Sequence, residues 1–226
     1  MKTTHKRLAL ALIFVGSSLC FHACKKDPPL STASEPVYSI TFNFNWNSTD
    51  FPTDYPSNPH FSKLIGWSHN DTSTFADTNT YATPGIKVMA ETGATNPLDD
   101  EYNAKIAAGE GLDMRIGDPL GSGTGQVTIH LKVSNTHPSV SAVTMIAPSP
   151  DWFVGIQNVN LLNNGVFVDS LTVNAYSYDA GTDNGTSFTS ANAATTPAQP
   201  ITFITNPPLG DSVNVPVLAT VSIRKQ

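Results

Sequence analysis

The residues of this chain best suited to chemistry are carboxylates in two turn sequences. The first, at 148–152, reads Pro-Ser-Pro-Asp-Trp and carries Asp151, and the second, at 179–185, carries Asp179 and Asp183. Carboxylate oxygens from neighbouring turns can coordinate calcium (Ca²⁺). Two carboxyl groups about 5–10 Å apart in a cleft can instead act as general acid and base. Asp in such turns also often bonds its own backbone. A calcium site, a metal-dependent hydrolytic site and a metal-free turn cluster are therefore all open.

The side chain after the first acid also has two interpretations. Trp152 either packs in the core beneath the loop or stands exposed as an aromatic group that faces a ligand. A catalytic interpretation has little further support in the sequence, which contains no nucleophile-elbow pattern and no His-Glu-x-x-His helix. We therefore expect a protein that is not an enzyme.

The elements that must position these loops are mostly strands. Alternating or continuous apolar residues predict strands over 37–46, 62–69, 127–134, 140–147, 166–178 and 215–224. Two short helices are predicted, over 84–92 after Thr83-Pro84 and over 97–108 with Asn96 as its cap. Seven to nine strands with no sustained helical period predict an all-β fold, an antiparallel β-sandwich with one or two short helices inserted.

The first 23 residues are typical of a signal peptide. Lys2, Lys6 and Arg7 precede an apolar run that is too short to span a bilayer. Ala23-Cys24 followed by lysines resembles a bacterial lipoprotein box, so we expect lipidation at Cys24, with Cys20 as the alternative. Residues 24–36 then form a polar, proline-rich tether, and residues 37–226 form the domain.

Charge narrows the choice of partner. The full chain has a formal net charge of −6; without the three basic residues of the signal peptide, nine basic residues remain against 18 acidic ones, a net charge of −9. An acidic surface repels a phosphate backbone, so a nucleic-acid partner is excluded. A membrane contact is expected through the lipid anchor alone.

Three segments of the chain resemble the spondin N-terminal domain of F-spondin and mindin. They are the stretch from Thr41 to Trp46 with Ile65-Gly66-Trp67-Ser68-His69, the stretch from Met145 to Gly155, and the stretch from Tyr178 to Gly185. Their order and spacing agree over about residues 37–224. The resemblance implies a C2-like antiparallel β-sandwich, a role in adhesion or matrix binding, and no enzymatic activity.

The resemblance also implies a metal site that this sequence only partly retains. In metal-binding members, calcium is held by the Asp of the Pro-Ser-Pro-Asp-Trp motif, a nearby main-chain carbonyl and an acid 19 residues earlier. These positions correspond to Asp151, to a carbonyl such as that of Ala147, and to Lys132. A lysine supplies no oxygen ligand, so an ion pair between Lys132 and Asp151 is predicted as a replacement for the metal.

Together these features predict a non-catalytic lipoprotein of the bacterial cell envelope, on the outer membrane or cell surface. Its sandwich would bind an extracellular protein or a glycan. The alternatives are a metal-dependent hydrolase that uses Asp151, Asp179 and Asp183, and a structural envelope component without a dedicated ligand.

Overall fold

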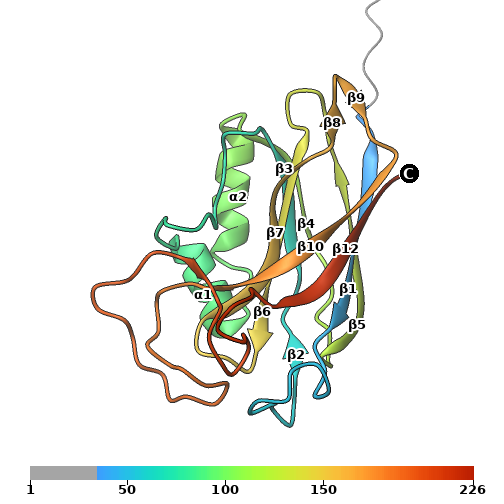
Figure 1. The fold of residues 1–226 in the computed structure, drawn as a ribbon. Helices are drawn as coiled ribbons and strands as arrows, with labels where there is room; N and C mark the ends of the chain where they lie inside the picture. Colours follow the sequence, from blue (N-terminus) through green and yellow to red (C-terminus); the bar gives the residue numbers. More distant parts are fainter. Residues whose placement is uncertain (1–34) are drawn as a thin grey trace, which may run out of the picture. The chain divides into compact units, whose positions relative to one another are not determined.

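The computed structural model describes residues 35–226, which form an antiparallel β-sandwich with a helical layer on one side (Figure 1). The signal peptide, Cys20, Cys24 and nearly all of the tether lie outside the described residues. The strands are β1 Val37–Asn45, β2 His60–Phe61, β3 Ile65–His69, β4 Gly111–Ile116, β5 Thr124–Lys132, β6 Ser139–Ala147, β7 Trp152–Asn160, β8 Leu162–Asn163, β9 Val166–Phe167, β10 Ser170–Asp179, β11 Thr202–Phe203 and β12 Val217–Lys225, and the helices are α1 Pro84–Thr92 and α2 Leu98–Ala107.

The strand order is β4-β3-β6-β7-β10-β12-β1-β5, with β2 beside β6, β11 beside β10, and a separate β8–β9 hairpin. All pairings between these strands are antiparallel. The path folds into two layers, β4-β3-β6-β7 and β10-β12-β1-β5. They are joined where β7 pairs with β10 over four residues only, from Gly155 opposite Tyr176 to Trp152 opposite Asp179. The predicted all-β sandwich is confirmed.

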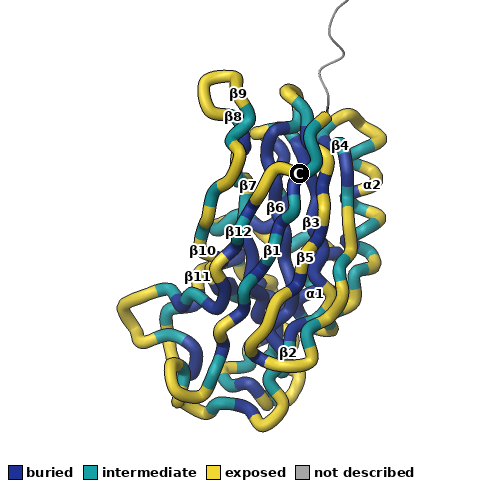
Figure 2. Tube along the Cα trace, turned by 90° about the vertical axis from the view of Figure 1, so that its right-hand side faces the viewer, coloured by how far each residue is buried: buried dark blue, intermediate teal, exposed yellow. Residues whose placement is uncertain are grey.

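Burial explains why the strands differ in sequence pattern. In β1, buried residues alternate with partly exposed ones, because one face meets the other sheet and one meets solvent. Every residue of β6 is buried, because the second sheet covers one face and the helices cover the other. Figure 2 shows this contrast between the buried strands and the exposed loops and hairpin. The apolar run at 140–147 is therefore a central strand covered on both faces.

Each helix begins in its own way. Thr83 caps α1, since its hydroxyl accepts a hydrogen bond from the N–H of Ile86. The prediction that Asn96 caps α2 is wrong: Pro97 occupies the cap position without a side-chain bond. Asn96 instead donates its amide to the carboxylates of Asp99 and Asp100 in the first turn.

Among the strands longer than two residues, β4 and β7 were not predicted. β4, of six residues, begins at Gly111, four residues after the end of α2. β7 begins at Trp152, directly after the Pro-Ser-Pro-Asp turn, and continues to Asn160. Among the described residues, none of the helices has both the length and the apolar character needed to cross a bilayer.

The two helices meet at a glycine, and this contact can be tested. A Cβ at Gly85 would lie 2.5 Å from Cα of Leu98 and 2.6 Å from Oε2 of Glu101. Alanine gains roughly 1 kcal/mol of helix propensity over glycine, but this overlap costs about 1–3 kcal/mol. We expect Gly85→Ala to lower the free energy of unfolding measured in urea. Gly121→Ala, where a Cβ meets no atom within 4 Å, is the control. A Gly85→Ala protein as stable as the control would show that the two helices do not approach this closely at Gly85.

Candidate functional site

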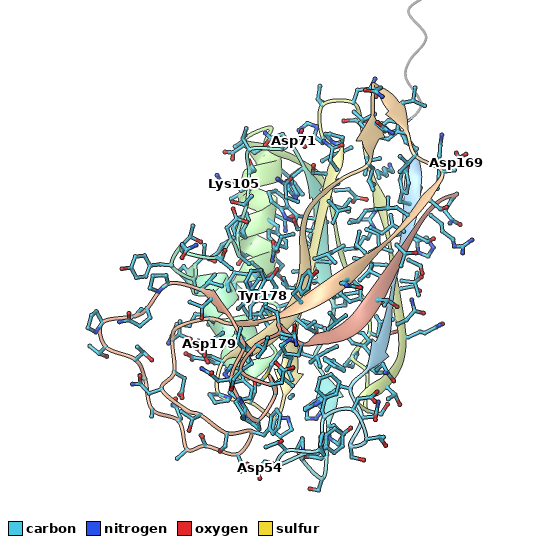
Figure 3. The ribbon with its side chains drawn as sticks, in the orientation of Figure 1. Asp54, Asp71, Lys105, Asp169, Tyr178 and Asp179 are labelled. Atoms are coloured by element: carbon cyan, nitrogen blue, oxygen red, sulfur yellow. The ribbon has the colours of Figure 1, made fainter. Side chains whose placement is uncertain are left out.

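The two acidic loops lie side by side at one end of the sandwich. Trp152, the first residue of β7, pairs with Asp179, the last residue of β10. The N–H of Ala180 donates to the main-chain oxygen of Asp151 at 3.1 Å. Figure 3 places Asp179 where β10 runs into the long loops that follow it. The structure therefore brings the second acidic turn beside the first.

The carboxylate of Asp151 ties the two loops together. Its side chain is 0% exposed, and its Oδ2 atom accepts hydrogen bonds from the N–H of Thr182 at 2.7 Å, the Thr182 hydroxyl at 3.2 Å and the N–H of Asp183 at 2.9 Å. Its Oδ1 atom is buried and has no hydrogen-bond partner in the described protein. One oxygen of this carboxylate is therefore hydrogen-bonded to the neighbouring loop, and the other has no hydrogen bond.

Burial dominates the electrostatics of this pair of loops. It raises the pKa of Asp151 to about 6, and the negative charge of Asp179 adds to the rise, while the three bonds from Thr182 and Asp183 oppose it. Burial also raises the pKa of Asp179 above its ordinary value; the N–H of Gly181 and the Trp152 side chain oppose this rise, and the charge of Asp183 adds to it. Both carboxyl groups thus hold their protons more tightly than free Asp.

The carboxylates of Asp179 and Asp183 mainly accept hydrogen bonds from main-chain N–H groups of the loops that follow β10. Asp179 accepts from the N–H of Gly181 at 2.8 Å, two residues on, and Asp183 accepts in the same way from Gly185 at 2.7 Å. The second oxygen of Asp183 accepts from the N–H of Ala193 at 2.7 Å, which fixes a more distant part of the chain. These are the Asx turns that Asp commonly forms.

The donor set does not fit a calcium ion. Calcium takes six to eight oxygen ligands, but both oxygens of Asp183, one of Asp179 and one of Asp151 already accept N–H bonds. Within residues 35–226, no group of three or more His, Cys, Asp or Glu side chains is arranged to hold a metal. The N–H bonds leave Oδ1 of Asp151 and the second oxygen of Asp179 as the carboxylate oxygens of these three residues without a main-chain N–H bond, fewer than a calcium site needs.

Ala147, the predicted carbonyl ligand, ends β6. It pairs with His60 of β2, on the edge of β6 that continues toward β3. The pairing of β6 with β7 stops two residues earlier, where Met145 faces Phe153. Strand pairing thus directs Ala147 toward β2, away from the loop that carries Asp179 and Asp183.

The predicted ion pair between Lys132 and Asp151 is wrong. Lys132 is the last residue of β5 and pairs with Val37 at the start of β1, whereas Thr124 pairs with Asn45 at the other end. At about 3.4 Å per residue the two ends of β5 are about 27 Å apart. Asp151 belongs to the Asn45 end, where Phe188 packs against both Trp46 and Trp152.

Lys132 precedes Asp151 by 19 residues, but the turn after β5 lies between them and carries the chain to the other sheet. The backbone N–H of Lys132 instead donates to Oδ2 of Asp113 at 2.9 Å. The other oxygen of Asp113 pairs with Arg115 at 2.7 Å. The carboxylate that contacts Lys132 therefore comes from β4.

Trp152 is not an exposed aromatic. Its side chain is 4% exposed, and its ring meets Phe188 edge-on with centroids 5.4 Å apart. It borders a small cavity of about 180 Å³ that Asp179 and residues 202–207 also line. The indole therefore supports the loops from within, and the rest of the cavity wall combines polar residues with apolar ones such as Phe203 and Ile204.

One residue of this site was missed from the sequence. Thr182 supplies two of the three hydrogen bonds that Asp151 accepts. A signal was present, since Thr182 lies inside the Asp-Ala-Gly-Thr-Asp turn. Its role could not be assigned without the pairing of β7 and β10, because 31 residues separate the two side chains.

The fold and site define a class of protein: an antiparallel sandwich in which a Pro-Ser-Pro-Asp-Trp turn is bonded to an Asp-Ala-Gly-Thr-Asp turn. Comparison with known proteins gives the same result, because the sequence matches the Spondin_N family over residues 36–214. The chain belongs to the spondin N-terminal domain family.

Its curated relatives are longer proteins. The chain is 37% identical to human Spondin-2 over 173 residues, which cover 75% of this chain and 52% of the relative. It is 38% identical to rat Spondin-2 over 175 residues, 74% and 52% of the two chains. With mouse Spondin-1 the identity is 28% over 215 residues, 84% of this chain and 26% of the relative. The chain thus spans about half of Spondin-2 and about a quarter of Spondin-1.

The raised pKa of Asp151 predicts how stability depends on pH. The folded protein binds this proton more tightly than the unfolded chain, so the contribution is complete below pH 3.8 and is lost as the pH rises to about 6. Relative to Asp151→Asn, which does not titrate, the wild-type free energy of unfolding should fall by about 2 kcal/mol across this window.

Asp211→Asn is the control for that measurement. Hydrogen bonds from Asn214 and Val213 lower the pKa of Asp211 to about 2, so its contribution changes below pH 3.8 and with the opposite sign. The stability difference between wild type and Asp211→Asn should therefore stay level from pH 4 to 6. A level curve for Asp151→Asn as well would contradict the buried, proton-binding carboxyl.

Calcium should leave the stability of the protein unchanged. A ligand that binds only the folded state raises the melting midpoint, but these loops offer too few free oxygens. We expect equal midpoints in millimolar calcium and in a chelator. A calcium-dependent rise that Asp151→Asn removes would restore the metal site.

Proposed function

We propose that this protein is a non-catalytic, lipid-anchored module of the bacterial cell envelope that binds an extracellular protein or glycan. One observation carries the proposal: the Spondin_N family model matches residues 36–214, which are nearly all of the residues that the structure describes. The function of the described chain is then the function of that domain, which in this family is adhesion or matrix binding.

The rigid loop end supports a binding role. Asp151 and Asp183 fix three segments of chain by hydrogen bonds to main-chain N–H groups. A loop that is ordered before binding loses less conformational entropy when a partner docks. In this proposal calcium is not required, because protein N–H groups take the place of a cation at Asp151.

The hydrolase alternative needs two accessible carboxyl groups in one cleft, but Asp179 and Asp183 line different cavities. A general acid or base must reach the substrate within hydrogen-bond distance, and Asp151 is fully buried. The ring Nε2 of His69 lies 2.8 Å from the hydroxyl of Ser141, which has the form of a nucleophile and base, but both residues are buried. Burial also lowers the pKa of His69. This pair is suited to packing, not to hydrolysis.

The lipid anchor at Cys24 rests on the leader sequence. The mature charge of −9 supports the expectation that nucleic acid is not a partner, since phosphate contacts need basic residues. An anchor with a tether of about a dozen residues would hold the domain close to the membrane while leaving it free to turn.

One experiment tests anchor and adhesion together. Bacteria that express the wild type, Cys24→Ser or Cys20→Ser are applied to surfaces coated with fibronectin, laminin or collagen. Wild-type and Cys20→Ser cells should adhere, and Cys24→Ser cells should lose most adhesion because the protein is no longer retained.

The released Cys24→Ser protein should still bind the same coating when purified. Loss of adhesion with Cys20→Ser alone would move the modification to Cys20. Failure of both cells and purified protein on every coating would contradict a matrix-protein ligand and leave a glycan-binding module or a structural envelope component.

A further inference from the structure

A groove opens on the side of the sandwich where β7 and β10 separate. After Gly155, the residues of β7 pair only with β6. Before Tyr176, the residues of β10 pair only with β12. The two strands diverge there, as Figure 1 shows, and their facing edges border a cavity of about 500 Å³. This volume lies within the range of small-ligand sites, about 300–1,000 Å³.

Two aromatic rings form one wall of the groove. Tyr176 is 38% exposed and Phe203 is 42% exposed, and their centroids lie 5.9 Å apart at an interplanar angle of 71°. Tyr178 supports Phe203 at 4.9 Å and is itself stacked on buried Phe153 at 5.0 Å. Pairing of Tyr178 with Phe203 between β10 and β11 fixes this arrangement. The rings are therefore exposed and held in place.

Amide side chains supply the polar part of the groove. Gln157 lines the cavity, and its Nε2 is buried without an acceptor anywhere in the described protein. An unpaired buried donor destabilises the folded protein, so an acceptor atom of a ligand would offset that cost. Asn174 lines the groove from β10 and is exposed. None of the lining residues carries a charge.

We infer that the groove between β7 and β10 binds a neutral saccharide. The apolar C–H face of a sugar ring can cover Phe203 or Tyr176, and its hydroxyls can bond to the amides of Gln157 and Asn174. An uncharged groove on residues 24–226, whose net charge is −9, gives no attraction to an anionic ligand. This inference rests on the proposed binding function and gives it a site and a ligand class.

A peptide strand fits the same groove less well. An added strand needs a regular edge, but β7 has a bulge where its register with β6 shifts between Val140 and Ala142. Within it Asn158 has a φ of 49°, and its N–H already donates to the hydroxyl of Ser141 at 2.8 Å. This edge therefore offers an interrupted row of backbone groups.

The test is affinity electrophoresis of the exported Cys24→Ser protein through gels containing laminarin, yeast mannan or soluble starch. At least one neutral polysaccharide should retard the protein. Phe203→Ala and Tyr176→Ala should each raise its dissociation constant about tenfold, as expected for the loss of one stacking ring. Tyr81→Ala is the matched control, since Tyr81 is 66% exposed and is not among the groove residues.

Gln157→Leu separates binding from folding. Removal of an unpaired buried amide should leave the melting midpoint unchanged or raise it, while the dissociation constant should rise about tenfold. No retardation by any of the three polysaccharides, or retardation that survives Phe203→Ala and Tyr176→Ala, would overturn the inference.

The experiments distinguish failure of the saccharide inference from failure of the proposed adhesion function. If Phe203→Ala abolishes binding to a matrix-protein coating and no polysaccharide retards the protein, the groove is a protein site, and the saccharide inference falls while the proposed function stands. If polysaccharide binding depends on the groove and no protein coating is bound, the saccharide inference stands and the ligand of the module is a glycan.

Discussion

The bond between the Asp151 carboxylate and the N–H groups of Thr182 and Asp183 is the constraint on which this end of the molecule depends. It joins a turn between two strands of one sheet to the loop that leaves the other sheet, at the place where the sheets share only four residue pairs. A buried carboxylate is costly unless it is paired. Here main-chain N–H groups compensate for one oxygen, and the raised pKa reflects the incomplete compensation at the other.

The narrow junction between the sheets also creates the groove. Because β7 stays with β6 and β10 stays with β12, the two strands can touch only near their loop ends. The same four-residue contact therefore brings the acidic loops together on its loop side. It also leaves aromatic and amide side chains uncovered on the side where β7 and β10 diverge. The rigid loop end and the groove are consequences of a single topological feature, and both lie in the domain shared with the spondins.

The helical layer explains how a chain without cysteines in its domain stays folded. The α1–α2 pair covers the outer face of β3 and β6, so that a second cluster of buried residues, including Trp67, Met89 and Tyr102, adds to the core between the sheets. Trp67 and Tyr102 stack with centroids 4.9 Å apart. A domain of this size can bury enough apolar surface to need no disulfide.

The sequence alone determined the sandwich class, most of the strands longer than two residues, both helices and the family, because these follow from local periodicity and from motifs that are contiguous in the chain. It also identified Asp151, Asp179 and Asp183 as the carboxylates of two turn sequences. Only the tertiary structure decided which atoms those carboxylates meet, that Lys132 lies at the far end of β5, that Trp152 is buried, and that Tyr176, Phe203 and Gln157 share a groove. Those facts depend on which strands are neighbours and where pairing stops, and residues 20 or more positions apart carry no local signal of either.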